Sequence, residues 1–195
     1  MTPATATRLV VPAHDLLGQY VNALRTGWSP DNMRAAAAQE QLEAIERDAD
    51  AFLAAMIDRE ARGGPVTLPD GSQVARLPGY RLWISDGEFC GSINLRWVPG
   101  TSDLPPHVLG HIGYAVVPWK AGRGHATRAL ALMLGRARDE GLATVTITTD
   151  PDNIASQRVI EANGGRDPEA FTRTAAYGGT HALRYRLATR VTETA

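Results

Sequence analysis

The stretch from Val116 to Leu130, VVPWKAGRGHATRAL, most constrains what this chain can fold into. Its apolar run stops at Pro118, because proline has no N–H group with which to continue a strand ladder. Two glycines follow, and from His125 onward apolar residues recur at spacings of three and four, which is typical of an amphipathic helix. The pattern therefore predicts a strand, a glycine turn and a helix in direct succession.

A helix that follows a glycine turn in this way suits an anionic ligand. The N–H groups of the first helical turn have no partner within the helix, and the helix dipole places partial positive charge at the same end. Gly122 and Gly124 let the backbone come close to a pyrophosphate, Thr127 adds a hydroxyl, and Arg123 and Lys120 add charge. A P-loop requires Lys-Ser or Lys-Thr after the glycines, and a dinucleotide fingerprint requires glycine at position 127, so neither motif is present.

Composition limits the remaining classes of protein. The chain has 195 residues, 44% of them hydrophobic, and we expect a single domain over 1–195 with a core from about 8 to 189. A net charge of -1 provides no overall field to attract nucleic acid or an anionic membrane. Cys90 is the only cysteine, which excludes an internal disulfide and a cysteine-rich metal site, so no metal is expected. The sequence shows neither a membrane-spanning run nor a secretory signal, and we expect a cytoplasmic protein.

Strands and helices are predicted on both sides of the glycine turn. Before it, strands are expected at 8–11, 80–85, 89–98 and 110–117. Helices are expected from a cap at Asp15 to about Gly27, and from about 39 to 61. Residues 63–78 form a linker with a small ribbon around Asp70 and Gly71, and residues 86–88 close a hairpin.

After the glycine turn, the helix from His125 is expected to end at Gly141 and to lead into a buried strand at 143–149. Strand, helix and strand in this order predict a right-handed parallel crossover. Another helix opens at 150–153 and ends at 163–165, a closing strand covers 182–188, and 166–180 is expected to be a largely irregular loop over the site. The whole pattern predicts an α/β or α+β sheet with helices on both faces.

At the glycine turn the sequence resembles the GNAT superfamily of N-acetyltransferases, in which a loop of the form Q/R-x-x-G-x-G/A holds the pyrophosphate of acetyl-coenzyme A (acetyl-CoA). Gly124 and Ala126 match the last two fixed positions of that loop, whereas Ala121 replaces the usual Gln or Arg. A second family segment, N-x-x-S-x-R-x-x-x-x-x-G, matches the residues Asn153, Ser156, Arg158 and Gly164 in register. The resemblance is firm over 89–165 and is nearest to a bacterial branch of predicted acetyltransferases.

This resemblance implies a GNAT-type central mixed, mostly antiparallel sheet with one parallel crossover, within a single acetyltransferase domain whose cofactor-binding part spans about 80–189. It implies that the N–H groups of Val116 and Val117 polarise the thioester and that Asn153 hydrogen-bonds the pantetheine arm. The alternative for each residue taken alone is a purely structural role, with Asn153 as a helix cap and Ser156 as a residue of the first turn. The implied acetyl-CoA site comprises Val116, Val117, Gly122, Arg123, Gly124, His125, Ala126, Thr127, Asn153 and Ser156.

Acetyl transfer to an amine requires a proton acceptor, because an amine of pKa about 10.4 is neutral only about once in 2,500 at pH 7, a deficit of roughly 4.6 kcal/mol. His111 is the best candidate for this base, and the alternative is a hydrogen-bonded histidine lining the sheet. The family's usual acid, a helix tyrosine, is replaced by Ile160. Either the thiolate leaves unassisted or another tyrosine protonates it, the candidates being Tyr114, Tyr177 and Tyr185.

The expected activity is direct acetyl transfer in a ternary complex to the amine of a small molecule or peptide, with no nucleic acid or membrane partner and with a homodimer left open. The acceptor pocket is expected to be lined by Arg96, Trp97 and Tyr177. Cys90 is a rival nucleophile, although a lone cysteine in a strand is more often a buried apolar residue. The alternative function is a non-catalytic acyl-CoA sensor, which Ala121 and Ile160 motivate.

Overall fold

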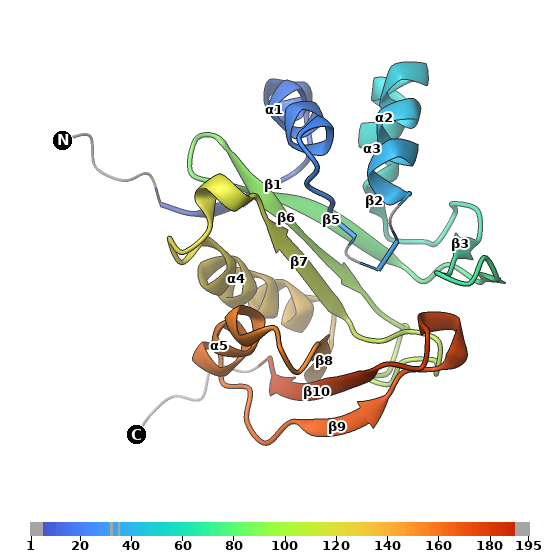
Figure 1. The fold of residues 1–195 in the computed structure, drawn as a ribbon, viewed down its shortest axis with the longest axis vertical. Helices are drawn as coiled ribbons and strands as arrows, with labels where there is room; N and C mark the ends of the chain where they lie inside the picture. Colours follow the sequence, from blue (N-terminus) through green and yellow to red (C-terminus); the bar gives the residue numbers. More distant parts are fainter. Residues whose placement is uncertain (1–5, 32, 35, 190–195) are drawn as a thin grey trace.

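In a computed structural model, residues 6–31, 33–34 and 36–189 can be described, and their strands form two main sheets (Figure 1). The larger sheet contains β1 (Arg8–Val10), β2 (Ile57–Asp58), β5 (Gly79–Ser85), β6 (Phe89–Arg96) and β7 (Ile112–Val116). The smaller contains β8 (Thr144–Thr149), β9 (Glu169–Thr172) and β10 (His181–Ala188), in the order β8-β10-β9. A separate hairpin pairs β3 (Val66–Thr67) with β4 (Gln73–Val74). The ladders within these sheets are antiparallel.

Helices cover both faces of the larger sheet, as the sequence predicts. The helices are α1 (His14–Arg25), α2 (Ala37–Arg47), α3 (Ala49–Ala55), α4 (His125–Asp139) and α5 (Ile154–Ala162). Ile93 and Leu95 of β6 belong to the core that α4 covers, whereas Tyr20 of α1 stacks on Trp83 of β5 with ring centroids 4.9 Å apart, in the core on the other face. In the described part of the chain, no helix is long and apolar enough to cross a membrane.

The two sheets meet at the start of β7 and separate from there. The N–H of His111 donates to the carbonyl of Thr146 at 2.8 Å, and a Cβ on Gly110 would lie only 2.9 Å from that same oxygen. Beyond this contact, no ladder joins β7 to β8 within the described residues, although α4 connects the two strands. The expected α/β fold with mostly antiparallel strands and helices on both faces is confirmed. The two strands of the crossover, β7 and β8, touch only near His111 and Thr146 and then separate into different sheets.

Two predictions for the first half of the chain were wrong. The helix expected over 39–61 is interrupted at Asp48, whose side chain accepts the N–H of Ala51 at 2.9 Å and caps α3 as a new helix. Its expected last turn instead contains β2, which pairs with β5. The cap expected at Asp15 is also displaced, because α1 begins at His14 after Ala13 and has no side-chain cap.

The segment expected to be irregular, 166–180, contains β9 and a 3-10 turn at Ala175–Tyr177. The strand pairs antiparallel with β10, the next strand of the chain, and Phe171 lies opposite Ala182. By contrast, the ribbon around Asp70 and Gly71 and the hairpin at 86–88 are confirmed. Segments with local turn signals were thus predictable, whereas β9, a short and mostly exposed strand at the edge of its sheet, was not.

Candidate active site

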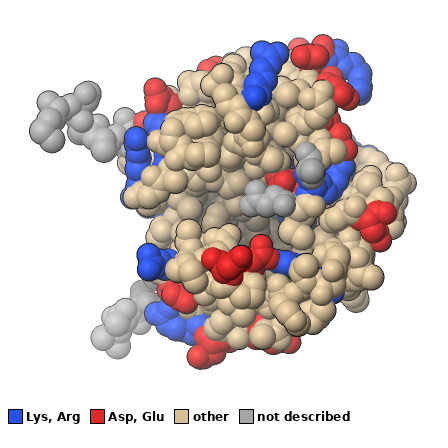
Figure 2. Space-filling view, viewed as in Figure 1, with Lys and Arg blue, Asp and Glu red and all other residues tan. Residues whose placement is uncertain are grey.

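Two adjoining cavities, of about 250 and 330 Å³, open where β7 and β8 separate and continue beneath the β3-β4 hairpin. The face drawn in Figure 2 is hollowed between the part that carries α1 and the part that carries α5 and β10. Tyr114, Asn153 and Ser156 line the smaller cavity. Both cavities are lined by Asp31, Val66, Leu68, Arg81, Asn94, Arg96 and Tyr177, so the two spaces share one wall.

The backbone of β7 directs alternate N–H groups toward β6 and toward the opening, as an antiparallel strand must. The N–H of Arg96 donates to the carbonyl of His111 at 2.9 Å, and the N–H of Val117 donates to that of Cys90 at 2.9 Å. By alternation, the N–H of Val116 faces away from β6. Of the two N–H groups expected to polarise a thioester, that of Val117 is therefore already bonded, and that of Val116 faces the opening.

Tyr114 and the first turn of α5 meet at this opening. The Tyr114 hydroxyl lies 2.8 Å from Oγ of Ser156, and Oδ1 of Asn153 accepts the N–H of Ser156 at 3.0 Å. Asn153 is thus the N-cap of α5, and its amide nitrogen remains for a ligand. Burial raises the pKa of Tyr114 to about 12, so the hydroxyl holds its proton at neutral pH.

The other tyrosines have different surroundings. Tyr177 donates to the carbonyl of His107 at 2.9 Å, while the hydroxyl of Tyr185 lies 3.5 Å from Glu161, away from both cavities. Ile160 is fully buried in the core beneath α4. Among the candidate acids, the geometry favours Tyr114.

His111 joins the two sheets. Its ring is fully buried, and Nδ1 accepts the N–H of Thr146 at 2.9 Å, which leaves the proton on Nε2. Nε2 has no hydrogen-bond partner within the described chain. Burial, reinforced by the charge of Arg96, lowers the pKa of His111 to about 4. These contacts fit the alternative of a neutral histidine that holds the sheets together better than they fit a general base.

The turn before α4 uses the conformational freedom of its glycines. Gly122 and Gly124 have φ of +73° and +75°, in the left-handed region that residues with a Cβ avoid. The carbonyl of Gly124 accepts the first intrahelical bond, from the N–H of Arg128, at 3.1 Å. The N–H groups of Ala126 and Thr127 precede that bond, and they are the donors with which a helix start binds phosphate. The residues of the turn therefore fit a pyrophosphate.

The side chains of Lys120 and His125 face away from that turn. Lys120 Nζ lies 2.7 Å from Glu88 and 3.0 Å from Asp86, so it does not supply the charge expected near phosphate. His125 is buried, with Nδ1 2.9 Å from the hydroxyl of Thr7 and Nε2 3.5 Å from Asp86. These contacts tie the start of α4 to the β5-β6 hairpin, and His125 offers the ligand only its backbone.

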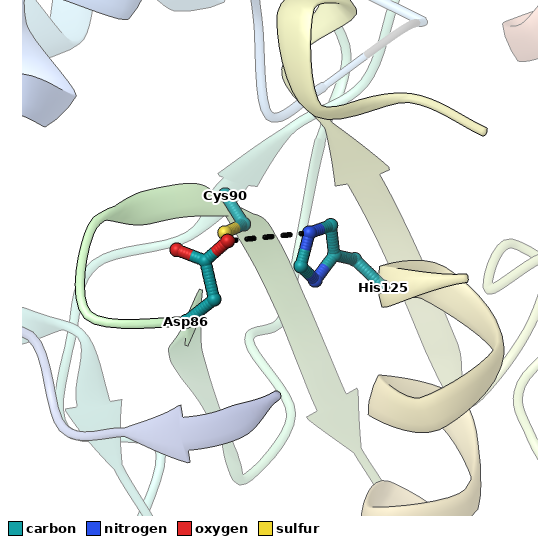
Figure 3. A group of neighbouring side chains, drawn as sticks. All are labelled: Asp86, Cys90 and His125. Carbon is teal, nitrogen blue, oxygen red and sulfur yellow. Dashed lines mark ion pairs between the residues drawn. The ribbon is translucent and has the colours of Figure 1, made fainter. Parts of the chain in front are cut away.

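Within this network, Asp86, Cys90 and His125 bring three potential metal ligands within 4.8 Å of one another (Figure 3). Lys120 already binds both carboxylate oxygens of Asp86, at 3.0 and 3.1 Å. Burial, together with the hydrogen bond to Asp86, raises the pKa of Cys90 to about 11, whereas a metal requires the thiolate. The cluster is better explained as an ion-pair network that supports the glycine turn.

Two of the three expected acceptor residues line the cavities and the third does not. Arg96 and Tyr177 line both cavities. Trp97, one position on, packs in the core edge-to-face against Tyr80, with ring centroids 5.8 Å apart, and lines neither cavity. The expectation for Trp97 is corrected accordingly, because successive side chains of a strand point to opposite faces.

Three residues at the site lie outside the expected set. Arg81 and Asn94 are register partners that line both cavities, and the polar-apolar alternation of their strands was the signal that could have revealed them. Arg128 donates from Nη2 to the carbonyl of Arg123 at 2.6 Å and from Nε to Thr7 at 2.8 Å. Its guanidinium therefore lies beside the glycine turn, where a basic residue in a first helical turn can meet phosphate.

The sequence matches the model of a known protein family. A family model described as "Acetyltransferase (GNAT) domain" matches residues 25–166. A search of curated proteins gave no significant match.

Several solved structures share the fold. The Microcin C7 self immunity acetyltransferase MccE, in complex with acetyl-CoA and AMP, has a TM-score of 0.60 and 13% identity over 96% of this chain and 97% of that one. RimJ of Mycobacterium smegmatis, in complex with CoA-disulfide, has a TM-score of 0.64 and 20% identity over 95% and 83%. RimL, a ribosomal L7/L12 alpha-N-protein acetyltransferase in complex with coenzyme A, has a TM-score of 0.60 and 14% identity over 95% and 96%. At these identities the likeness concerns the fold.

Proposed function

The chain belongs to the GNAT family of acetyltransferases, and from this premise we propose that it transfers the acetyl group of acetyl-CoA to an amine by direct attack. Acetyl-CoA is the cosubstrate of this family. The observation that carries the proposal is the opening between β7 and β8, where the hydroxyl of Tyr114 and the first turn of α5 border a cavity. A thioester and an amine would meet at this place.

The cofactor would extend from the glycine turn to that opening. Backbone N–H groups from Gly122 to Thr127 would bind its pyrophosphate, with Arg128 beside them. The free amide nitrogen of Asn153 would donate to the pantetheine arm. Ala121 is exposed and offers no side-chain donor, so the backbone carries this contact.

Three groups of the chain then divide the chemistry, while bound acetyl-CoA supplies an acetyl thioester. The N–H of Val116 would polarise the thioester carbonyl as the amine nitrogen attacks its carbon. Tyr114 would give its proton to the sulfur as the carbon–sulfur bond breaks. Asp31, which lines both cavities and whose Oδ1 accepts the N–H of Met33 at 2.9 Å, would take the proton of the amine directly or through water.

A covalent acetyl-cysteine route has little support from the geometry. Cys90 is fully buried, and its thiol points to the carbonyl of Glu88 with the sulfur 3.6 Å from that oxygen. Its raised pKa, about 11, keeps the sulfur protonated at neutral pH. Direct attack of the amine avoids this unreactive thiol.

The proposal is tested by incubating the purified protein with acetyl-CoA and a panel of amines while free thiol is measured. We expect thiol release that depends on at least one amine. Binding of acetyl-CoA without consumption in the presence of every amine would instead favour the sensor function. The buried Ile160, which leaves the family's usual acid position without a proton donor, is the observation behind that second function.

A further inference from the structure

The wall shared by the two cavities carries two arginines on neighbouring strands. Arg81 of β5 lies opposite Asn94 of β6, and Arg96 follows Asn94 by two residues, so all three occupy one face of the sheet. Both arginines line both cavities. Both arginines thus border the space next to the opening, and the side chain of Arg81 also reaches the buried Tyr20.

These two arginines lack the carboxylate partners that the other cavity arginines have. Arg34 pairs with Glu40 at 2.5 Å, Arg173 with Asp150 at 2.5 Å, and Arg76 with Asp58 at 3.8 Å. Within the described residues, no carboxylate lies within 4.0 Å of Arg81 or Arg96. Asp31 lines the same wall but is outside that distance.

Arg96 is only partly satisfied by its neighbours. In the amide orientation that suits both partners, Asn94 accepts from Nη2 of Arg96 at 2.9 Å and donates to the carbonyl of Gly113 at 2.9 Å. A guanidinium has five N–H donors, so most of them remain for a ligand. Burial lowers the pKa of Arg96 and the charge of Arg81 adds to this effect, while Tyr177 and Asp31 oppose it. An anion bound between the two arginines would offset both the burial of the Arg96 charge and its repulsion by Arg81.

Arg96 also lies close to the part of β7 that borders the proposed reaction site. Gly113 of β7 precedes Tyr114, and a Cβ built on Gly113 would lie 3.8 Å from Nη2 of Arg96. Because glycine carries no side chain here, the guanidinium lies close to the β7 backbone at the point where the opening begins. An anion held by Arg96 would thus be one part of an acceptor whose amine reaches the thioester.

We propose that Arg81 and Arg96 bind a carboxylate or phosphate of the acceptor, so that the substrate is a small amine bearing an oxyanion. Planar guanidinium groups match the geometry of both oxyanions through paired hydrogen bonds. The inference rests on the proposed acetyl transfer and adds the chemical class of the acceptor. Together the cavities have the volume of a small-molecule site.

The experiment uses acceptor pairs that differ in the presence of one oxyanion group. Amino acids are compared with their amides, and phosphoethanolamine with ethanolamine, by mass spectrometry of the acetylated products. We expect the anionic member to have at least tenfold higher kcat/KM in one of the two pairs, and which pair responds distinguishes carboxylate from phosphate. Arg81→Gln and Arg96→Gln should bring the two members of the pair to within about threefold, whereas Arg138→Gln, an exposed change on α4, should leave their ratio as in the wild type.

A binding measurement separates failure of this inference from failure of acetyl transfer. With coenzyme A saturating, calorimetric titration of the anionic acceptors should show binding to the wild-type protein that both glutamine variants lose. If no amine is acetylated yet this binding is found, acetyl transfer fails while the oxyanion site stands. Equal use of charged and neutral amines would overturn the oxyanion site alone. So would weakened coenzyme A binding in Arg96→Gln with an unchanged acceptor ratio, since the arginines would then serve the cofactor.

Discussion

The hydroxyl of Tyr114 lies 2.8 Å from Oγ of Ser156, so that β7 and α5 touch across the opening between the two sheets. In the proposed mechanism this hydroxyl is the proton donor, because Ile160 stands at the position of the family's helix tyrosine. We predict that Tyr114→Phe lowers kcat about 100-fold, the usual scale for loss of a general acid, while acetyl-CoA affinity stays within about twofold. Tyr185→Phe, which removes a hydroxyl facing Glu161 away from the cavities, is the control. An unchanged kcat in Tyr114→Phe would remove the tyrosine from the mechanism.

The same tyrosine has a consequence for pH dependence. Burial raises the pKa of Tyr114 from 10.0 to about 12, and an acid is active while it is protonated, below its pKa. Between pH 8 and about 10.5, kcat should therefore not fall through loss of this proton. A fall with a midpoint near 10 in the wild type that is absent from Tyr114→Phe would contradict the buried, protonated hydroxyl.

The glycine turn gives a prediction about binding. Gly124 has φ of +75°, and a Cβ there would lie 2.8 Å from Nη1 of Arg128, so valine both strains the turn and displaces the guanidinium beside it. Gly124→Val should weaken acetyl-CoA binding at least tenfold, about 1.4 kcal/mol, by calorimetric titration. Circular dichroism should show a folded protein. Gly135→Val, in the middle of α4 with open space around the new Cβ, should bind normally.

The helix caps Asn153 and Asp48 distinguish an effect on stability from an effect on acetyl-CoA binding. Asn153→Ala and Asp48→Ala each remove a side-chain acceptor from a helix N-terminus, and each should cost about 1 kcal/mol in urea unfolding. Asn153→Ala should also weaken acetyl-CoA binding, by less than Gly124→Val does, because it removes one further hydrogen bond. Equal acetyl-CoA affinity in the two cap variants would mean that Asn153 is only a cap.

The buried His111 makes stability depend on acid. The pKa of His111 is about 4 in the folded protein and 6.5 in the unfolded chain. Between these pH values the unfolded chain therefore binds a proton at His111 that the folded protein does not bind. The free energy of unfolding should fall from pH 6.5 down to pH 4, by up to about 3 kcal/mol from this residue, and no further below. Urea unfolding across this range should show a shallower fall in His111→Gln. A kcat midpoint near pH 6.5 that His111→Gln abolishes would restore His111 as the base.

Cys90 distinguishes direct from covalent transfer. Because its thiol is buried and protonated at neutral pH, Cys90→Ala should keep kcat within a few-fold of the wild type. Stability should drop by about 1 kcal/mol through the small cavity left behind. Complete loss of turnover with normal acetyl-CoA binding would require an acetyl-cysteine intermediate.

The glycine turn and the start of α5 were predictable because their signals are local. Gly122 and Gly124 stand where the backbone adopts positive φ, and Asn153 caps α5, so these residues carry their own structural reason in the sequence. The break at Asp48 also had a local signal, a capping side chain, but the apolar stripe continues through α2 and α3 and favoured one helix.

Features that depend on tertiary contact were less accessible. The alternation of polar and apolar residues predicts that Arg96, the last residue of β6, and Trp97 point to opposite faces of the sheet. It does not show which face borders a cavity and which packs against α4. The role of His111 depends on Thr146, a residue of another strand, and could not be chosen from its own sequence surroundings. The Lys120 ammonium likewise faces Asp86 and Glu88 rather than the glycine turn that follows it in sequence.

The central claim is that the protein transfers an acetyl group at the opening between β7 and β8. The most direct measurement follows that group from isotope-labelled acetyl-CoA. After incubation with the amine panel, mass spectrometry should find label in one or more amines in an amount equal to the thiol released, and Gly124→Val should release far less at the same limiting acetyl-CoA concentration. Label that stays on coenzyme A, although titration shows acetyl-CoA bound, would contradict the account.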